Sequence, residues 1–223
     1  MTDIPDIAIW THRWTPLLPR CAESVVAHTR DNYNLIIVCE AGNCHQNMNR
    51  VLLRSRSRYT VFLDEDVEIL DNDWFDIAIG DLKATPDLGV VGCREIKDEF
   101  ERAMYRHTRN VLLATLEQPL SFVTWVPAYV MAFDRSRCAA LAFDEAIPGA
   151  KGMTDVDMCL QIRNHGLRVA VDNRVCVYHP HKRPQDRGVN GVPTKAEELI
   201  WFEAQRAYMT EKWGEAYTKD PTL

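Results

Sequence analysis

The sequence has no apolar run long enough to cross a lipid bilayer. A membrane helix needs about 20 consecutive, mostly apolar residues, and polar or charged residues interrupt the apolar stretches of this 223-residue chain well before that length. The first residues, MTDIPDIAIWTHRW, also lack the basic start and the apolar stretch of a secretory signal peptide. We therefore expect a cytoplasmic protein without a membrane span.

Paired cysteines and an excess of basic residues are also missing. The chain has seven cysteines, an odd number, without a Cys-x-x-Cys spacing, and its formal net charge is −6. We expect buried, reduced thiols and no structural zinc site. A nucleic-acid-binding protein usually has a basic stripe, whereas the arginines and lysines here form only local clusters, at 50–58 and 182–187.

Short apolar runs alternate with helical patterns along the chain. The expected strands lie over 6–10, 34–39, 59–64, 88–93, 122–126, 129–133, 167–171 and 175–179. The expected helices lie over 17–30, 45–57, 73–83, 135–141, 154–165 and 195–213, while 98–121 is ambiguous. This alternation predicts an α/β fold, with a mostly parallel, Rossmann-like sheet flanked by helices. Ligands of such folds bind beyond the carboxyl ends of the strands.

The composition changes after residue 181. The segment PHKRPQDRGVNGVP at 180–193 has three prolines and two glycines, which is typical of a loop. We expect a single-domain core over 1–181, followed over 182–223 by a flexible loop and a C-terminal helix that packs on the core. The loop is expected to close over a bound ligand. Thr194 with Glu197, and Thr154 with Asp157, predict capping boxes at two helix starts.

An acidic cluster follows the third expected strand, in VFLDEDVEIL. Side chains alternate between the two faces of a strand, so Asp64 and Asp66 point the same way. Two carboxylates at a strand end repel each other unless a cation lies between them, and Mg²⁺ and Mn²⁺ favour such oxygen ligands. A solvated acidic turn is the alternative interpretation of so short a motif.

A second group of polar residues lies in the segment 143–181. Asp155 and Asp157 fall in the first turn of an expected helix, where carboxylates interact favourably with the helix dipole and can cap it. His179 and His181 flank a proline at the end of the last expected strand. This spacing suggests a positioned ligand, and a neutral imidazole suits manganese.

Taken together, these segments resemble the family-two glycosyltransferases, which have a GT-A fold. The matching positions are Asn49, Tyr59, Phe62-Leu63-Asp64-Glu65-Asp66, Phe143-Asp144-Glu145, Asp155, Asp157, Cys159, Gly166, Val169 and His179. The sequence departs from the family pattern at Val51, Ser55, Ser57, Thr154 and Gln161. The resemblance covers about residues 6 to 181.

The resemblance implies a nucleotide-sugar donor, expected to be a UDP-sugar, with Mn²⁺ or Mg²⁺ as cofactor. It implies that Asp66 and His179 bind the metal, with His181 as the alternative histidine. Asp64 would contact the donor ribose or a metal-bound water. Glu40, which ends the second expected strand, stands where the family has a nucleotide-reading Asp, although an ordinary polar strand exit explains it equally well.

Four further residues receive roles from the same resemblance. Asn49 would belong to the donor-binding residues, and Lys182 and Arg183 would reach the leaving diphosphate, unless they are simply a solvated basic loop. Asp155 would be the general base of an inverting sugar transfer to a hydroxyl group. Asp157 is interpreted as structural.

Two other functions remain open. A sugar-phosphate nucleotidyltransferase needs a glycine-rich basic loop after its first strand, and IWTHRWTPLLPR lacks the glycines. A non-catalytic nucleotide-sugar-binding protein would not need Asp155. The sequence leaves the acceptor open among a glycan, a lipid-linked sugar, a protein, a small molecule and, with less support from the acidic net charge, a hydroxylated DNA base.

Overall fold

The computed structural model describes residues 1–11, 14–149, 152–180 and 194–218. Its strands are β1 (Asp6–Thr11), β2 (Asn34–Cys39), β3 (Tyr59–Asp64), β4 (Glu68–Ile69), β5 (Leu88–Ile96), β6 (Leu120–Val123), β7 (Val130–Asp134) and β8 (Arg168–Tyr178). Its helices are α1 (Leu17–His28), α2 (Cys44–Arg54), α3 (Trp74–Ala84), α4 (Glu99–Thr115), α5 (Thr154–Asn164), α6 (Lys195–Trp213) and α7 (Glu215–Thr218). Among these described helices, none combines the length and apolar character needed to cross a bilayer.

The strands form one mixed sheet in the order β2-β1-β3-β7-β5-β8-β4, and β6 pairs with β8. Strands β2, β1, β3, β5 and β8 share one direction, whereas β7, β4 and β6 run against them. The expected α/β fold with a mostly parallel sheet is therefore confirmed. The carboxyl ends of β1, β3, β5 and β8 meet at one edge of the sheet, where ligands of such folds bind.

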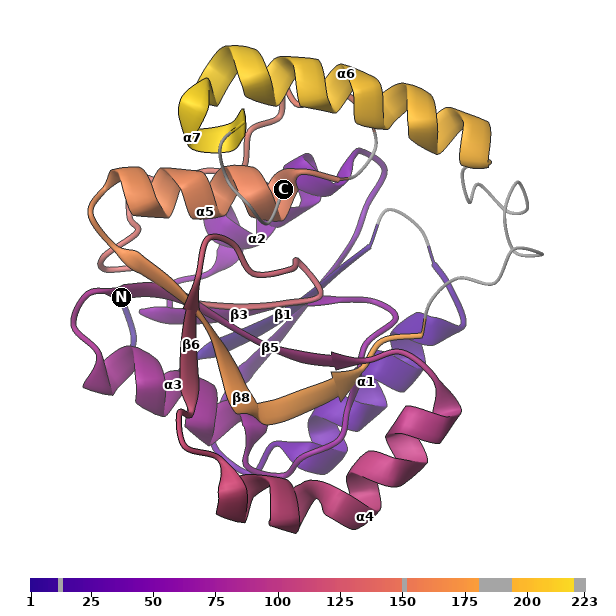
Figure 1. Cartoon of the computed structure of the whole chain (residues 1–223), viewed down its shortest axis with the longest axis vertical. Coiled ribbons are helices and arrows are strands. Elements are labelled where there is room, and N and C mark those ends of the chain that lie inside the picture. Colours follow the sequence, from indigo (N-terminus) through magenta and orange to yellow (C-terminus); the bar gives the residue numbers. More distant parts are fainter. Residues whose placement is uncertain (12–13, 150–151, 181–193, 219–223) are drawn as a thin grey trace.

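Apolar side chains cover both faces of the sheet. Ile7, Ile9 and Leu63 pack on the face covered by α1 and α3, while Ala8 and Phe62 pack on the face covered by α2 and α5. Figure 1 shows α2 and α5 above the sheet and α1, α3 and α4 below it. Each fully buried large apolar side chain contributes about 1.5–3 kcal/mol, so the two layers hold the strand ends in fixed positions.

Several elements differ from the sequence expectations. Residues 135–141 form turns and no helix, because the Asp134 carboxylate accepts from the backbone N–H of Ser136 and so favours a turn over a helix. The two strands expected within 167–179 are one strand, β8. Its middle is held by Asp172, which accepts from the backbone N–H of Arg174 at 2.6 Å. The ambiguous stretch contains α4 and β6.

The start of α5 also differs from the expected capping box. Met153 is the N-cap residue, in the left-handed region at φ 54°, and Thr154 is the first helical residue. The Thr154 hydroxyl does not cap the helix and instead contacts Cys44 Sγ at 3.1 Å and His45 Nδ1 at 3.0 Å. The box at Thr194 and Glu197 is confirmed. All seven cysteines are free, and all but Cys39 are buried.

The C-terminal helix α6 packs beside α5, and ionic contacts join the end of α6 to the first turn of α5 and the segment before it (Figure 1). Lys212 Nζ lies 2.5 Å from Asp144 Oδ2 and 2.7 Å from Asp157 Oδ1. The indole N–H of Trp213 also donates to Asp157 at 2.7 Å, and the Asp157 residue is only 1% exposed. Asp157 thus links the first turn of α5 to the end of α6.

Lys212→Ala is expected to lower the free energy of unfolding by about 2–4 kcal/mol, because it leaves the buried Asp157 carboxylate without its cationic partner. Lys195→Ala, at the exposed start of the same helix, is the matched control and should change stability by less than about 0.5 kcal/mol. Urea unfolding monitored by tryptophan fluorescence measures both. Equal stability of the two variants would contradict a structural role for this ion pair.

Candidate functional site

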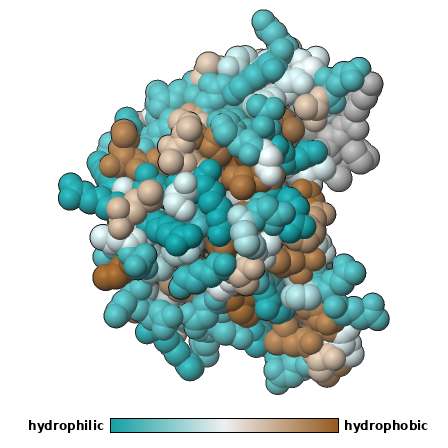
Figure 2. Space-filling view, turned by 90° about the vertical axis from the view of Figure 1, so that its left-hand side faces the viewer, coloured by the Kyte–Doolittle hydropathy of each residue, from teal (hydrophilic) through white to brown (hydrophobic). Residues whose placement is uncertain are grey.

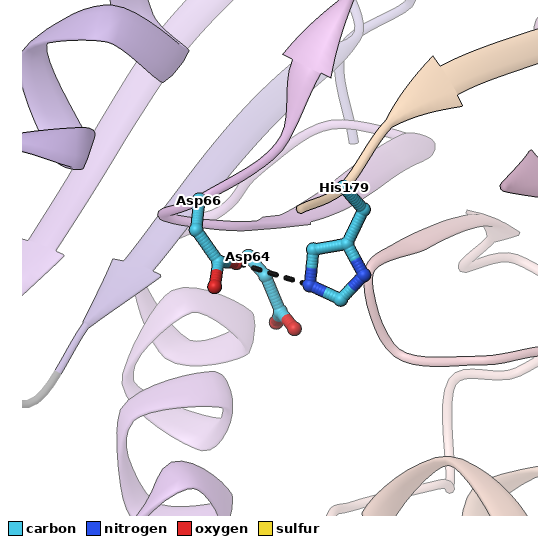
Figure 3. Close-up of side chains that lie close together, drawn as sticks. All are labelled: Asp64, Asp66 and His179. Carbon is cyan, nitrogen blue, oxygen red and sulfur yellow. Dashed lines mark ion pairs between the residues drawn. The ribbon is translucent and has the colours of Figure 1, made fainter. Parts of the chain in front are cut away.

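Three ligand-type side chains meet at the carboxyl edge of the sheet. Asp64 ends β3, Asp66 lies in the turn that follows, and His179 comes directly after β8. One ligand atom from each lies within 4.8 Å of the others, and His179 Nε2 is 3.2 Å from Asp66 Oδ1. Figure 3 shows the three side chains converging on one point.

The local fold explains why residues so far apart in sequence meet. The N–H of Val67 donates to the carbonyl of Asp64, which closes a tight turn around Glu65 and Asp66. Strand β4 follows at once and pairs antiparallel with the end of β8, with Glu68 opposite Tyr178. This short pairing places the acidic turn next to Tyr178, the residue that precedes His179.

Negative charge is in excess around Asp64, Asp66 and His179. Burial, followed by the charges of Asp66 and Glu65, raises the pKa of the Asp64 carboxyl to about 8. Burial alone would lower the pKa of His179, but its hydrogen bond to Asp66 and the charges of Asp66 and Asp64 raise it to about 9. The negative charge of Asp66 contributes to both shifts.

A divalent cation fits this group of residues. The buried Asp64 Oδ1 has no hydrogen-bond partner among the described residues, and an unpaired buried carboxylate oxygen is costly unless something binds it. Two carboxylates and one imidazole are ligands that Mn²⁺ accepts readily. The expected pairing of Asp66 with a C-terminal histidine therefore has the required geometry at His179.

Two residues outside the expected site hold His179 in place. Glu95, near the end of β5, places Oε1 2.7 Å from His179 Nδ1. The ring of Tyr129 lies 5.2 Å from the imidazole, and its hydroxyl donates to the carbonyl of Cys93. Glu95 was missed because the expected strand ended at residue 93, whereas β5 continues past a register shift between Cys93 and Arg94.

Glu95→Gln is expected to weaken Mn²⁺ binding by about 10- to 100-fold, because a carboxylate fixes the orientation of a ligating histidine and raises its basicity. The matched control is Glu101→Gln, on the first turn of the neighbouring α4, which should leave the affinity unchanged. Mn²⁺ titration followed by electron paramagnetic resonance gives both values. Unaltered affinity in Glu95→Gln would show that His179 does not depend on this contact.

Asp155 lies at the start of α5, and two backbone N–H groups orient its carboxylate. Ala128 N–H donates to Oδ2 at 3.0 Å, and Val156 N–H donates to Oδ1 at 2.9 Å. Burial raises the pKa of Asp155 despite these two hydrogen bonds. Burial thus acts against the helix dipole, which favours an ionised carboxylate in the first turn.

A buried polar cluster lies behind Asp155. His45 is fully buried, and burial lowers its pKa, so it is a neutral imidazole at pH 7. It contacts Thr154, the residue before Asp155, and its Nε2 has no hydrogen-bond partner among the described residues. No sequence pattern predicts this contact, because 109 residues separate the two positions.

The other expected site residues have different surroundings. The Glu40 carboxylate forms ion pairs with Arg50 and Arg54. The Asn49 amide donates to Phe143 O and Glu145 Oε1, both at 2.8 Å, so it joins α2 to the segment before α5. Neither Glu40 nor Asn49 belongs to the group formed by Asp64, Asp66 and His179. The remaining three expected site residues, His181, Lys182 and Arg183, and the expected lid at 182–193 lie outside the described residues.

No family model and no curated protein sequence matches the chain. Solved structures do match it by shape. A mannosyltransferase, PcManGT from Pyrobaculum calidifontis, solved with GDP-Man and Mn²⁺, superposes with a TM-score of 0.57 and 17% identity, over 82% of this chain and 58% of that one. GalNAc-T7, solved with UDP, GalNAc and Mn²⁺, superposes with a TM-score of 0.63 and 11% identity, over 96% of this chain and 51% of that one.

This chain has a GT-A-type fold. It spans little more than half the length of either of these two glycosyltransferases. A third match, A197 from STIV, is closer in size, with a TM-score of 0.52 and 14% identity over 79% of this chain and 85% of that one. At these identities the likeness establishes the fold, so the chemistry of this chain must be argued from its own residues.

Proposed function

We propose that this protein is a metal-dependent glycosyltransferase that moves a sugar from a nucleoside-diphosphate sugar to a hydroxyl acceptor, with inversion at the anomeric carbon. The observation that carries the proposal is the convergence of Asp64, Asp66 and His179 at the carboxyl edge of a GT-A-type sheet. The structural relatives solved with GDP-Man or UDP and with Mn²⁺ support the same kind of donor. A UDP-sugar is the first donor to test.

Asp66 and His179 would hold the divalent cation, and Asp64 would contribute its unpaired carboxylate oxygen or bind the donor ribose. When bound, the cation supplies positive charge that stabilises the leaving diphosphate. Glu95 and Tyr129 keep the His179 ring oriented. The excess negative charge seen in the raised pKa of Asp64 and His179 is what such a cation would neutralise.

Asp155 would take the proton from the acceptor hydroxyl. Its raised pKa makes it a better base than an ordinary carboxylate, because a general base works best when its pKa lies near the working pH. The charge of Asp155 also contributes to the raised pKa of Asp64, so the two carboxylates share one electrostatic environment. The base and the metal ligands would thus act on opposite sides of one bond.

Donor recognition is proposed for the other expected residues. Glu40 directly follows β2 at the same edge of the sheet, and its two arginine partners would hold the carboxylate in one orientation for the nucleotide. Asn49 would support this side of the site through its contacts with Phe143 and Glu145. Lys182 and Arg183 would neutralise the diphosphate, and His181 is the second candidate for the metal.

A thermal-shift panel of UDP-, GDP- and other nucleotide sugars, each with Mn²⁺ and with a chelator, tests the proposal. We expect stabilisation by one nucleotide class that the chelator removes. A sugar-phosphate nucleotidyltransferase would instead release pyrophosphate from a nucleoside triphosphate and a sugar phosphate. A binding protein would show the shift without consuming donor. Stabilisation that is insensitive to the chelator would contradict the metal-dependent mechanism.

A further inference from the structure

Helix α4 leaves an apolar groove open beside the candidate active site. The groove has a volume of about 520 Å³, and its apolar lining includes Ile96, Met104, Val111 and Leu112. The exposed fractions of Met104 and Val111 are 46% and 65%, and Phe100 on the same helix is 75% exposed. Figure 2 shows apolar side chains gathered at its lower right, where α4 lies.

The core holds α4 mainly by polar contacts, and Tyr105 is its only buried residue. The Tyr105 hydroxyl donates to Asp71 Oδ2 at 2.6 Å, and Arg109 Nε lies 2.7 Å from Asp71 Oδ1. Arg102 pairs with Glu68. Ile96 and Leu112 of the groove lining also pack with Tyr105. Met104 and Val111 take no part in this cluster and stay exposed, so their side chains are available to a ligand.

The groove is continuous with the site that would hold the metal. Glu95 and Ile96 both line it. Glu95 is also the carboxylate that contacts His179 Nδ1, and the carbonyl of Ile96 accepts the backbone N–H of His179 at 3.0 Å. A ligand in the groove therefore lies against the two residues that hold His179, and one end of it can reach the edge of the sheet where transfer would take place.

We propose that this groove binds the apolar part of the acceptor, so that the acceptor is an amphipathic hydroxyl compound such as a sugar carried on an alkyl or lipid chain. This inference rests on the proposed function. The hydroxyl residues of the lining are Tyr105, Thr108 and Thr115, and its charged members are Arg94, Glu95 and Glu101. A flexible hydrocarbon chain matches this lining, whereas a free, fully polar sugar would leave Met104, Val111 and Leu112 exposed to water.

A series of methyl, butyl, hexyl and octyl glycosides of glucose, galactose and mannose, kept below the concentration of micelle formation, tests the acceptor site. With donor and Mn²⁺ present, KM is expected to fall about tenfold or more from the methyl to the octyl compound, because added methylenes leave water. The double variant Met104→Asp/Val111→Asp should remove this dependence. Leu53→Asp, on α2 across the sheet and also exposed to solvent, should retain it.

Binding is measured separately, through the ¹³C-methyl resonance of Met104 during titration with octyl and methyl glucoside, and calorimetry with UDP-sugar and Mn²⁺ tests the donor. No donor binding would defeat the proposed function, while the methionine resonance would still report on the groove. A KM independent of chain length, or a Met104 resonance that octyl glucoside leaves unmoved, would overturn the inference. A third result would also overturn the inference: the wild type is a dimer, the double variant is a monomer, and the two have the same KM. In that case a second copy of the chain covers the groove.

Discussion

Asp66→Ala is expected to abolish Mn²⁺-dependent binding of the donor nucleotide, with a loss of about 100-fold or more in affinity. A bound cation contributes several kcal/mol to stabilising a diphosphate, and each 1.4 kcal/mol is a factor of ten in affinity. Asp66 lies 3.2 Å from His179 and has no equivalent substitute in the three-residue group. Isothermal titration of UDP and GDP, with and without Mn²⁺, measures the effect.

Glu65→Gln is the matched control, because Glu65 lies in the same acidic turn but is not part of the ligand group. It removes one negative charge from the turn and should change nucleotide affinity by less than about tenfold, since a nearby charge is worth far less than a direct ligand. If Asp66→Ala binds nucleotide as tightly as the wild type, or if a chelator leaves wild-type binding intact, the cation has no part in donor binding.

The core of the site could be predicted from the sequence because strand geometry is regular. Asp64 and Asp66 come after Val61-Phe62-Leu63, whose side chains alternate between the two buried faces of the sheet, and His179 directly follows strand β8. Parallel strands bring their carboxyl ends to one edge, so such residues become neighbours without any long-range information. The turn at Asp64 and the pairing of β4 with β8 then bring the side chains within bonding distance.

The residues that support the site could not be predicted in this way. Glu95 follows an irregularity in the pairing of β5 with β8, and a shift of one residue changes which face a side chain points to. The contact between His45 and Thr154 joins two helix starts that lie far apart in sequence. Helix α4 was ambiguous because Tyr105 is its only buried residue, so its apolar side chains do not mark a stripe that faces the core.

The first turn of α5 offers a direct comparison of the carboxylate proposed as the general base, Asp155, with a neighbouring carboxylate, Asp157. Asp157 is fully engaged, since it accepts from Gln161, from Trp213 and from Lys212. Within the part of the chain that the structure describes, Asp155 accepts only from backbone N–H groups, and burial raises its pKa. Substituting asparagine at each position changes charge with little change in shape, so the pair separates chemistry from stability within one helical turn.

Asp155→Asn is expected to lower turnover by about 10²–10⁴-fold, the usual contribution of a positioned general base, while donor affinity stays within about threefold of the wild type. Asp157→Asn should keep turnover but lower the melting temperature, because it weakens the contact with Lys212. Donor hydrolysis, with water as the acceptor, provides an assay before the true acceptor is known. In the wild type the rate should rise with pH through a pKa above the ordinary range of a carboxyl, because Asp155 must be ionised to accept a proton and burial raises its pKa.

The stereochemistry of the product gives an independent test of the same residue. A base that activates the acceptor on the face opposite the leaving diphosphate produces a single displacement, so the new glycosidic bond should have the anomeric configuration opposite to that of the donor. Proton NMR of the product formed from an octyl glycoside reads this configuration directly. A retained configuration would require a different mechanism, and an Asp155→Asn variant with wild-type turnover would remove Asp155 from the chemistry even if the product were inverted.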